Sequence, residues 1–118
     1  MINDLNTFGL IFETMAVRDL RVYAEALDGK VYHYRDSYGL ECDAVVHLRN
    51  GQYGLVEIKL GGETLIEEGA ATLRKLAAKI DTTKMPAPAF LMVLTAVGRY
   101  ALRRKDGVLV VPISGLKD

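Results

Sequence analysis

Three charged residues in two neighbouring segments have the types and spacing of a metal site. Asp43 lies within residues 41–48, whereas Glu57 and Lys59 stand two positions apart within residues 53–60. Both segments alternate apolar and polar-leaning residues, which predicts two strands joined by a short turn. Side chains at alternate positions of a strand point to the same side, so Asp43, Glu57 and Lys59 are expected on one face of a sheet.

The length of the turn decides whether the two carboxylates meet. A two-residue turn at Asn50-Gly51 would set Asp43 opposite Ile58. A three-residue turn, with Gly51 as the left-handed residue of a bulge, sets Asp43 directly opposite Glu57. We predict the second arrangement because it keeps the apolar residues of both strands on one face. These apolar residues are Cys42, Ala44, Val46, Leu48, Val56, Ile58 and Leu60.

Two carboxylates that face each other across an antiparallel ladder repel unless something binds between them. Their oxygen atoms suit a hard cation such as Mg²⁺, with Mn²⁺ as its substitute, which accepts one or two carboxylates together with water and phosphate oxygens. Lys59, on the same predicted face, could offset negative charge or orient a water molecule. The alternative is a cross-strand charge cluster with a purely structural role.

A long helix is predicted to precede these strands, because residues 7–27 contain one glycine, no proline and apolar residues at helical spacing. One stripe consists of Phe8, Ile11, Phe12, Met15, Val22 and Ala26, and the neighbouring stripe of Leu10, Glu13, Val17, Leu20, Ala24 and Leu27. Glu13 is the one acidic member. It could add a third carboxylate if the helix packs over the polar face, or it could reach water from a helix boundary.

The remaining pattern predicts an α/β (α+β) domain with the order α-β-β-β-α-β followed by a C-terminal hairpin. The other predicted elements are a strand at 30–35, a helix at 63–80, a buried central strand at 90–94 and a hairpin of 99–103 with 108–111. The 118 residues, with 50% hydrophobic and 25% charged residues, fit a single domain over residues 1–118.

Cysteine content and charge distribution indicate a cellular location and a class of partner. The single cysteine, Cys42, cannot close a disulfide within the chain, and no cationic leader or membrane span is apparent, so a cytoplasmic location is expected. Residues 1–70 carry six basic against twelve acidic side chains, whereas residues 71–118 carry nine against three. The basic second half could attract phosphate, although solvated faces explain the same segregation.

The chain resembles the PD-(D/E)XK nuclease superfamily in carrying Asp43 and Glu57-Ile58-Lys59 after a helix that contains Glu13. The core of that superfamily has the same αβββαβ order. Most of the chain, from Phe8 to about Pro112, is more closely similar to the C-terminal domain of unknown function of predicted prokaryotic AAA+ superfamily ATPases. The strings that carry this likeness are Phe12-Glu13, Val17-Arg18-Asp19-Leu20, Val31-Tyr32-His33-Tyr34-Arg35-Asp36, Gly39-Leu40-Glu41-Cys42-Asp43-Ala44-Val45 and Val56-Glu57-Ile58-Lys59-Leu60-Gly61. Cys42 stands where the superfamily name has proline. The chain contains no P-loop, so the ATPase itself is absent.

This resemblance implies a restriction-endonuclease-like fold, with a central mixed sheet flanked by helices, and a metal-dependent nuclease that acts on DNA, or on RNA. It implies one Mg²⁺ held by Asp43, Glu57 and the carbonyl group of Ile58, with Glu13 as a direct or water-mediated ligand. Lys59 would position the attacking water or stabilise developing charge. Phosphate contacts independent of sequence would come from Arg74, Lys75, Lys79, Arg103, Arg104 and Lys105.

The implied partners are a P-loop AAA+ ATPase domain or subunit and a second copy of this chain. The alternative is a catalytically silent module of the same fold that binds nucleic acid or docks onto such an ATPase. A small-molecule enzyme has less support, because the chain has no Gly-rich dinucleotide loop and no Ser-His-Asp setting.

Overall fold

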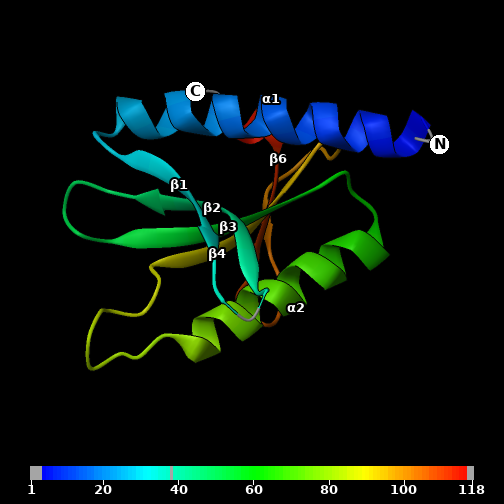
Figure 1. Ribbon diagram of the computed structural model, residues 1–118. Coiled ribbons are helices and arrows are strands. Elements are labelled where there is room, and N and C mark those ends of the chain that lie inside the picture. The colour runs from blue at the N-terminus through cyan, green and yellow to red at the C-terminus, as the bar shows by residue number, and fades with distance from the viewer. Residues whose placement is uncertain (1–3, 38, 117–118) are drawn as a thin grey trace.

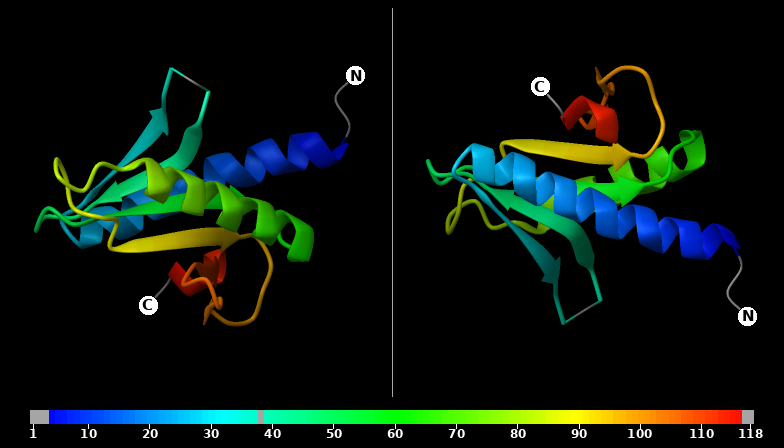
Figure 2. Two further views of the ribbon diagram at one scale, coloured as in Figure 1. Left: turned by 90° about the horizontal axis from the view of Figure 1, so that it is seen from below. Right: turned by 90° about the horizontal axis from the view of Figure 1, so that it is seen from above.

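One six-stranded mixed sheet lies between two helices in the computed structural model of the protein, which describes residues 4–37 and 39–116 (Figure 1). In chain order the elements are α1 (Asp4–Ala26), β1 (Lys30–Arg35), β2 (Glu41–His47), β3 (Tyr53–Lys59), α2 (Glu63–Lys79), β4 (Phe90–Thr95), β5 (Leu102–Arg103), β6 (Leu109–Pro112) and the short 3-10 helix η1 (Ile113–Leu116). The predicted fold class is confirmed. The views from above and below the sheet show α1 on one face and α2 on the other (Figure 2).

The strand order is β1-β2-β3-β4-β6-β5. Neighbours β1, β2 and β3 are antiparallel, and the crossover through α2 brings β4 parallel to β3. The predicted C-terminal hairpin forms from β5 and β6, and β6 adds itself in parallel to β4, so the hairpin extends the main sheet. Its first strand is shorter than the predicted range 99–103.

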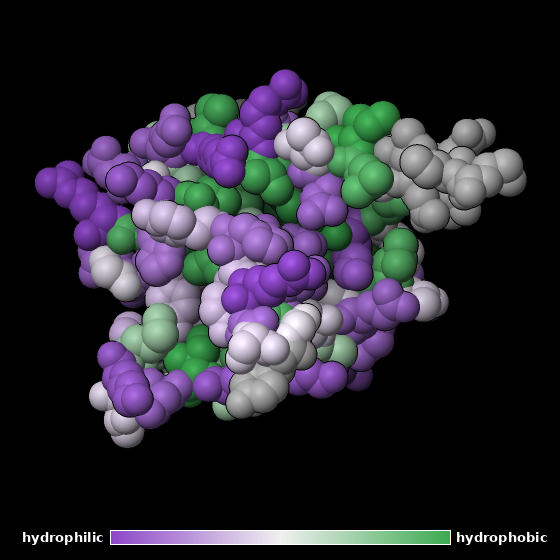
Figure 3. Space-filling model, viewed as in Figure 1, coloured by the Kyte–Doolittle hydropathy of each residue, from purple (hydrophilic) through white to green (hydrophobic). Residues whose placement is uncertain are grey.

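Helix α1 packs on the sheet through a row of residues four positions apart. These residues are Phe12, Ala16, Leu20 and Ala24. The row falls between the two predicted stripes, and Ile11, Met15 and Val22 of the first stripe are exposed. Two alanines in the row allow the helix backbone to approach the strands closely, whereas several large apolar residues outside the row are left on the outer surface, where hydrophobic side chains are visible along α1 (Figure 3). The side chain of Phe8 lies outside the described residues.

Two apolar layers result, one on each face of the sheet. The layer under α1 contains Ala44, Val46, Val56 and Ile58, together with Met92 and Leu94 of β4. The layer under α2 contains Leu55 and Val93 with the helix residues Ala70, Leu73 and Leu76. Strand β4 therefore contributes to both layers, which confirms its predicted central position. No helix within the described ranges is long and apolar enough to cross a membrane.

Candidate functional site

Strands β2 and β3 pair in the register that brings the two carboxylates together. The pairing runs from His47 opposite Tyr53 to Ala44 opposite Val56, and one further step sets Asp43 opposite Glu57. The turn between them has three residues, because the Leu48 N–H donates to the Gln52 carbonyl at 2.8 Å. Gly51 has a φ of 87°, in the left-handed region that glycine favours. The predicted register and turn are confirmed.

Each carboxylate is fixed by a backbone N–H of the opposite strand. The Asp43 N–H donates to Glu57 Oε2 at 3.0 Å, and the Ile58 N–H donates to Asp43 Oδ2 at 2.8 Å. These side-chain bonds continue the connection between the strands past the Ala44–Val56 pair. The two carboxyl groups are therefore held side by side at the end of the ladder with little freedom to separate.

Burial and mutual repulsion raise the pKa of Glu57. Its residue is only 7% exposed, and desolvation followed by the negative charge of Asp43 raises the pKa to about 8. The N–H bond from Asp43 and the positive charge of Lys59 act in the opposite direction. The pair therefore carries a proton near neutral pH, and a divalent cation could neutralise the same charge in its place.

Lys59 lies on the same side of the sheet as Glu57, beside α2. Its Nζ is 3.9 Å from Glu68 Oε2, and its side chain is about one quarter exposed, at 26%. Gly69 provides room for the lysine stem, because a Cβ at that position would lie 3.4 Å from Lys59 Cγ and 3.1 Å from Val93 Cγ2. Sequence reasoning missed Glu68. The available signal was its position directly before Gly69, because a glycine within a predicted helix indicates close packing against a neighbouring element.

Glu13 reaches this neighbourhood from the other helix. The condition that α1 packs over the polar face is not met, because α1 covers the apolar face of Ala44 and Val56. Even so, burial and then the charge of Asp43 are the largest causes that raise the pKa of Glu13, and Lys59 lowers it. Glu13 is thus an electrostatic neighbour of the pair.

A bulge in β2 separates Cys42 from the other apolar residues of its strand. Tyr32 pairs with Val45 and Tyr34 with Cys42, so one residue of β1, His33, faces two residues of β2. Cys42 consequently joins the layer under α2 instead of the predicted face with Ala44. An extra residue at such a position re-aims the side chains around it, here those next to Asp43.

The bulge also brings a histidine and a further acid to the site. His33 Nδ1 lies 3.5 Å from the Asp43 carbonyl oxygen, and His33 Nε2 lies 3.4 Å from Glu41 Oε2. Both groups influence the pKa of Glu13, Glu41 raising it and His33 lowering it. Sequence reasoning did not assign either residue to the site, because the bulge that places them has no clear sequence signature.

A metal ion would have two carboxylates to bind at this point. Within residues 4–37 and 39–116, no three His, Cys, Asp or Glu side chains lie together in a way that could hold a metal ion. Asp43 and Glu57 fit the two-carboxylate set that Mg²⁺ accepts when water and phosphate oxygens complete its shell. In this arrangement Glu13 suits a water-mediated contact better than a direct one.

The six basic residues predicted to contact phosphate have different surroundings. Arg74 and Arg104 both pair with Glu67 and with Asp106, which ties α2 to the β5–β6 hairpin. Lys79 lines a cavity at the end of α2. The other three, Lys75, Arg103 and Lys105, are exposed.

Comparison with known proteins gives one match. A family model described as a domain of unknown function, DUF4143, matches residues 8–116. No curated protein and no solved structure matches the chain.

Proposed function

The chain belongs to the DUF4143 family, and from this membership and the site geometry we propose that it is a metal-dependent nuclease-like domain that hydrolyses phosphodiester bonds of DNA. The observation that carries the proposal is the pair of Asp43 and Glu57, locked side by side by N–H bonds of 3.0 and 2.8 Å. Lys59 stands on the same face as Glu57. This set, on an αβββαβ core, is the one for which the PD-(D/E)XK superfamily is named.

Asp43, Glu57 and the Ile58 carbonyl group would hold one Mg²⁺ or Mn²⁺, with Glu13 bound through water. When bound, such an ion polarises a phosphate oxygen and lowers the pKa of a coordinated water. Glu57 gives up its proton when the ion occupies the pair. Lys59 would place its ammonium group near that water or near the developing negative charge, and Glu68, with Oε2 3.9 Å from Lys59 Nζ, would position the ammonium.

A partner ATPase is part of the proposal. DUF4143 domains are found C-terminal to AAA ATPases. We therefore propose that this domain acts together with a P-loop AAA+ domain or subunit. Pairing of two copies would let two sites cut both strands of a duplex.

The test is cleavage of supercoiled plasmid and of circular single-stranded DNA in Mg²⁺ and in Mn²⁺, followed on a gel. We expect metal-dependent cutting that Asp43→Asn and Lys59→Ala reduce at least a hundredfold. The matched control is Asp28→Asn, which removes one carboxylate at the opposite end of the sheet, where Asp28 pairs with exposed Arg49. Absence of cutting of either DNA in both metals would contradict the proposal.

A catalytically silent module of the same fold is the second candidate, and one observation favours it. In the described part of the chain, no buried side-chain nitrogen or oxygen lacks a hydrogen-bond partner. With a proton on Glu57, the carboxylate pair is therefore satisfied without a metal. This candidate predicts DNA binding, or binding to the ATPase, that survives Asp43→Asn and is unaffected by a chelator.

A further inference from the structure

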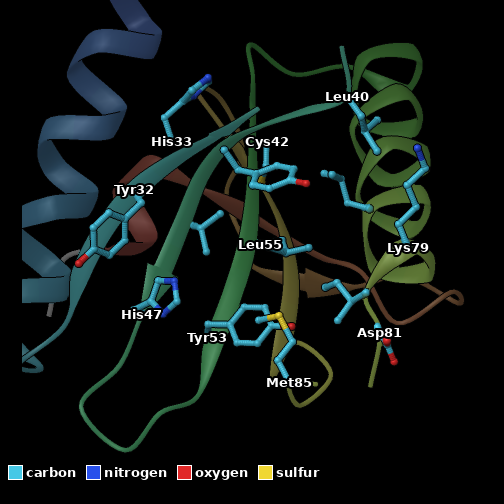
Figure 4. Close-up of a pocket in the computed structure, with 14 residues that line it drawn as sticks. Tyr32, His33, Leu40, Cys42, His47, Tyr53, Leu55, Lys79, Asp81 and Met85 are labelled. Carbon is cyan, nitrogen blue, oxygen red and sulfur yellow. The ribbon is translucent and has the colours of Figure 1, made fainter. Parts of the chain in front are cut away.

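A cavity of about 370 Å³ opens on the α2 side of the sheet, between β1, β2 and the end of α2 (Figure 4). Its floor includes Cys42 and Leu55, and Lys79 stands on its α2 wall. Such a volume falls within the range of small-ligand sites in proteins. Neither the family match nor the proposed hydrolysis accounts for it.

Aromatic rings follow one another along the cavity. Tyr32 meets His47 edge to face, with ring centres 5.2 Å apart, and His47 stacks on Tyr53 at 5.8 Å with 25° between the ring planes. Figure 4 shows these three rings in a row that crosses from β1 over β2 to β3. The Tyr53 hydroxyl donates to the Pro86 carbonyl at 2.7 Å, which closes the inner end of the row.

The outer rings of the cavity are accessible. Helix α2 packs mainly against β2, β3 and β4, whereas β1 is an edge strand, so within the described residues the α2 side of β1 is left largely uncovered by helix. Tyr32 and Tyr34 stand two residues apart on that side and are 51% and 44% exposed. Half-exposed rings on an uncovered strand face are the means by which many proteins stack unpaired bases.

The cavity lies next to the strand segments that carry the carboxylate pair, although neither carboxylate lines it. Cys42 lines the cavity and directly precedes Asp43, and Leu55 lines it two positions before Glu57 on the same face of β3. Two residues along a strand span about 7 Å. A base in the cavity can therefore have its own phosphate beside Asp43 and Glu57.

The rim of the cavity carries one acidic and one basic side chain. The Asp81 carboxylate is bound by the Thr83 N–H and hydroxyl groups. Lys79 lies two residues before Asp81, at the same end of α2, and adds one positive charge beside this negative one. The two charges offset each other, so the choice of occupant rests on the aromatic faces above an apolar floor, which match a base better than a purely aliphatic side chain.

We propose that this cavity binds an unpaired base of a single-stranded nucleic acid whose backbone passes the Asp43–Glu57 pair. The inference rests on the proposed function, because it specifies the substrate class of that same site. Stacking on Tyr32 and Tyr34 supplies affinity for a splayed base, which a base-paired duplex cannot offer.

Fluorescence anisotropy tests the proposal in the Asp43→Asn chain with Mg²⁺, where cleavage is blocked. We expect a labelled single-stranded oligonucleotide to bind at least tenfold more tightly than a blunt duplex of equal length. Tyr32→Ala and Tyr34→Ala should each weaken single-strand binding roughly tenfold. The matched control is Tyr100→Ala, which removes a 77% exposed tyrosine outside the cavity lining and should change nothing.

An oligonucleotide that lacks bases separates stacking from phosphate binding. The Asp43→Asn chain should bind this oligonucleotide about tenfold more weakly than it binds the ordinary single strand. The two tyrosine variants should bind it with the same affinity as the Asp43→Asn chain. Equal affinity for single strand and duplex, or tyrosine variants that bind like the parent, would overturn the proposal and fit a protein side chain in the cavity. Thermal melting of each variant checks that the half-exposed tyrosines are not required for folding.

The cleavage assay distinguishes this inference from the proposed function. Single-strand binding that depends on Tyr32 and Tyr34, without cutting in either metal, supports the base cavity and contradicts the nuclease. Metal-dependent cutting that is unchanged by Tyr32→Ala and Tyr34→Ala supports the nuclease and contradicts the base cavity.

Discussion

Glu57 is held in a position where its charge is costly, because the residue is buried and faces a second carboxylate. In the folded chain its pKa is raised to about 8, whereas an unperturbed glutamate titrates near 4.5. Between these two values the unfolded chain loses a proton that the folded chain keeps. The Glu57 contribution to the free energy of unfolding is therefore fully present below about pH 4.5 and is lost as the pH rises through about 8.

We predict that the chain unfolds at a lower urea concentration at pH 8.5 than at pH 6, with a chelator present at both values. Glu57→Gln is neutral throughout and should flatten this dependence, because the amide has no proton to lose. Glu25→Gln on the exposed face of α1 is the control and should keep the wild-type slope. A Glu57→Gln chain with the wild-type slope would show that Glu57 titrates at its ordinary value.

The residue scale also shows why only part of the site was predictable. Asp43, Glu57 and Lys59 follow from strand alternation and from one glycine in the turn, both of which are local features of the sequence. Cys42 was assigned to the wrong face, because a bulge depends on the pairing of β1 with β2 and inverts the alternation without a marker of its own. Glu68 depends on tertiary packing of α2 in the same way.

Among the elements, the bounds of the first strands were predicted more accurately than the packing face of α1. The turn residues around β2 and β3 fix their ends to within one position, and β1 has its predicted bounds. For α1, hydrophobicity alone favoured the large residues Ile11 and Met15, yet the helix packs through Ala16 and Ala24. Close approach to a sheet selects small residues, and a count of apolar positions does not detect that preference.

Gly54 of β3 leaves space for the ring of Phe90 on the neighbouring strand β4. It pairs with Phe90 of β4, and a Cβ at Gly54 would lie 2.1 Å from Phe90 Cζ. We predict that Gly54→Ala lowers the free energy of unfolding by about 1–3 kcal/mol, because the ring must move out of a packed layer. Denaturant unfolding measures this change.

Phe90→Leu should relieve that clash, so the double variant should lose less stability than the sum of the two single variants. Gly9→Ala on α1, where an added Cβ meets nothing within 4 Å, is the control for the effect of one methyl group. Additive losses in the double variant would mean that Gly54 matters for a reason other than the Phe90 ring.

At the scale of the whole molecule, the site joins both layers: Glu13 belongs to α1, Lys59 lies against α2, and the carboxylate pair connects β2 to β3. An ion bound there should stabilise the complete domain. We predict that Mg²⁺ or Mn²⁺ at ten times its dissociation constant raises the melting temperature at pH 8 by about 5 °C. Calorimetry with and without a chelator measures the shift.

Asp43→Asn and Glu57→Gln should remove this metal-dependent rise, and Asp28→Asn should retain it, since Asp28 lies at the far end of the sheet in an exposed ion pair. An equal rise in all four chains would place the stabilising ion elsewhere. This measurement needs no DNA, so it examines the metal site separately from cleavage.

One oxygen of each carboxylate, Oδ2 of Asp43 and Oε2 of Glu57, accepts an amide proton, so an occupant of the site binds directly beside these two backbone bonds. Hydrogen–deuterium exchange at just two positions, the amides of Asp43 and Ile58, would then change when an ion or a phosphate arrives, while the Leu48 amide at the turn provides an internal reference. The exchange rates of these two amides would thus report whether the site is occupied, without the need for a substrate or a fluorescent label.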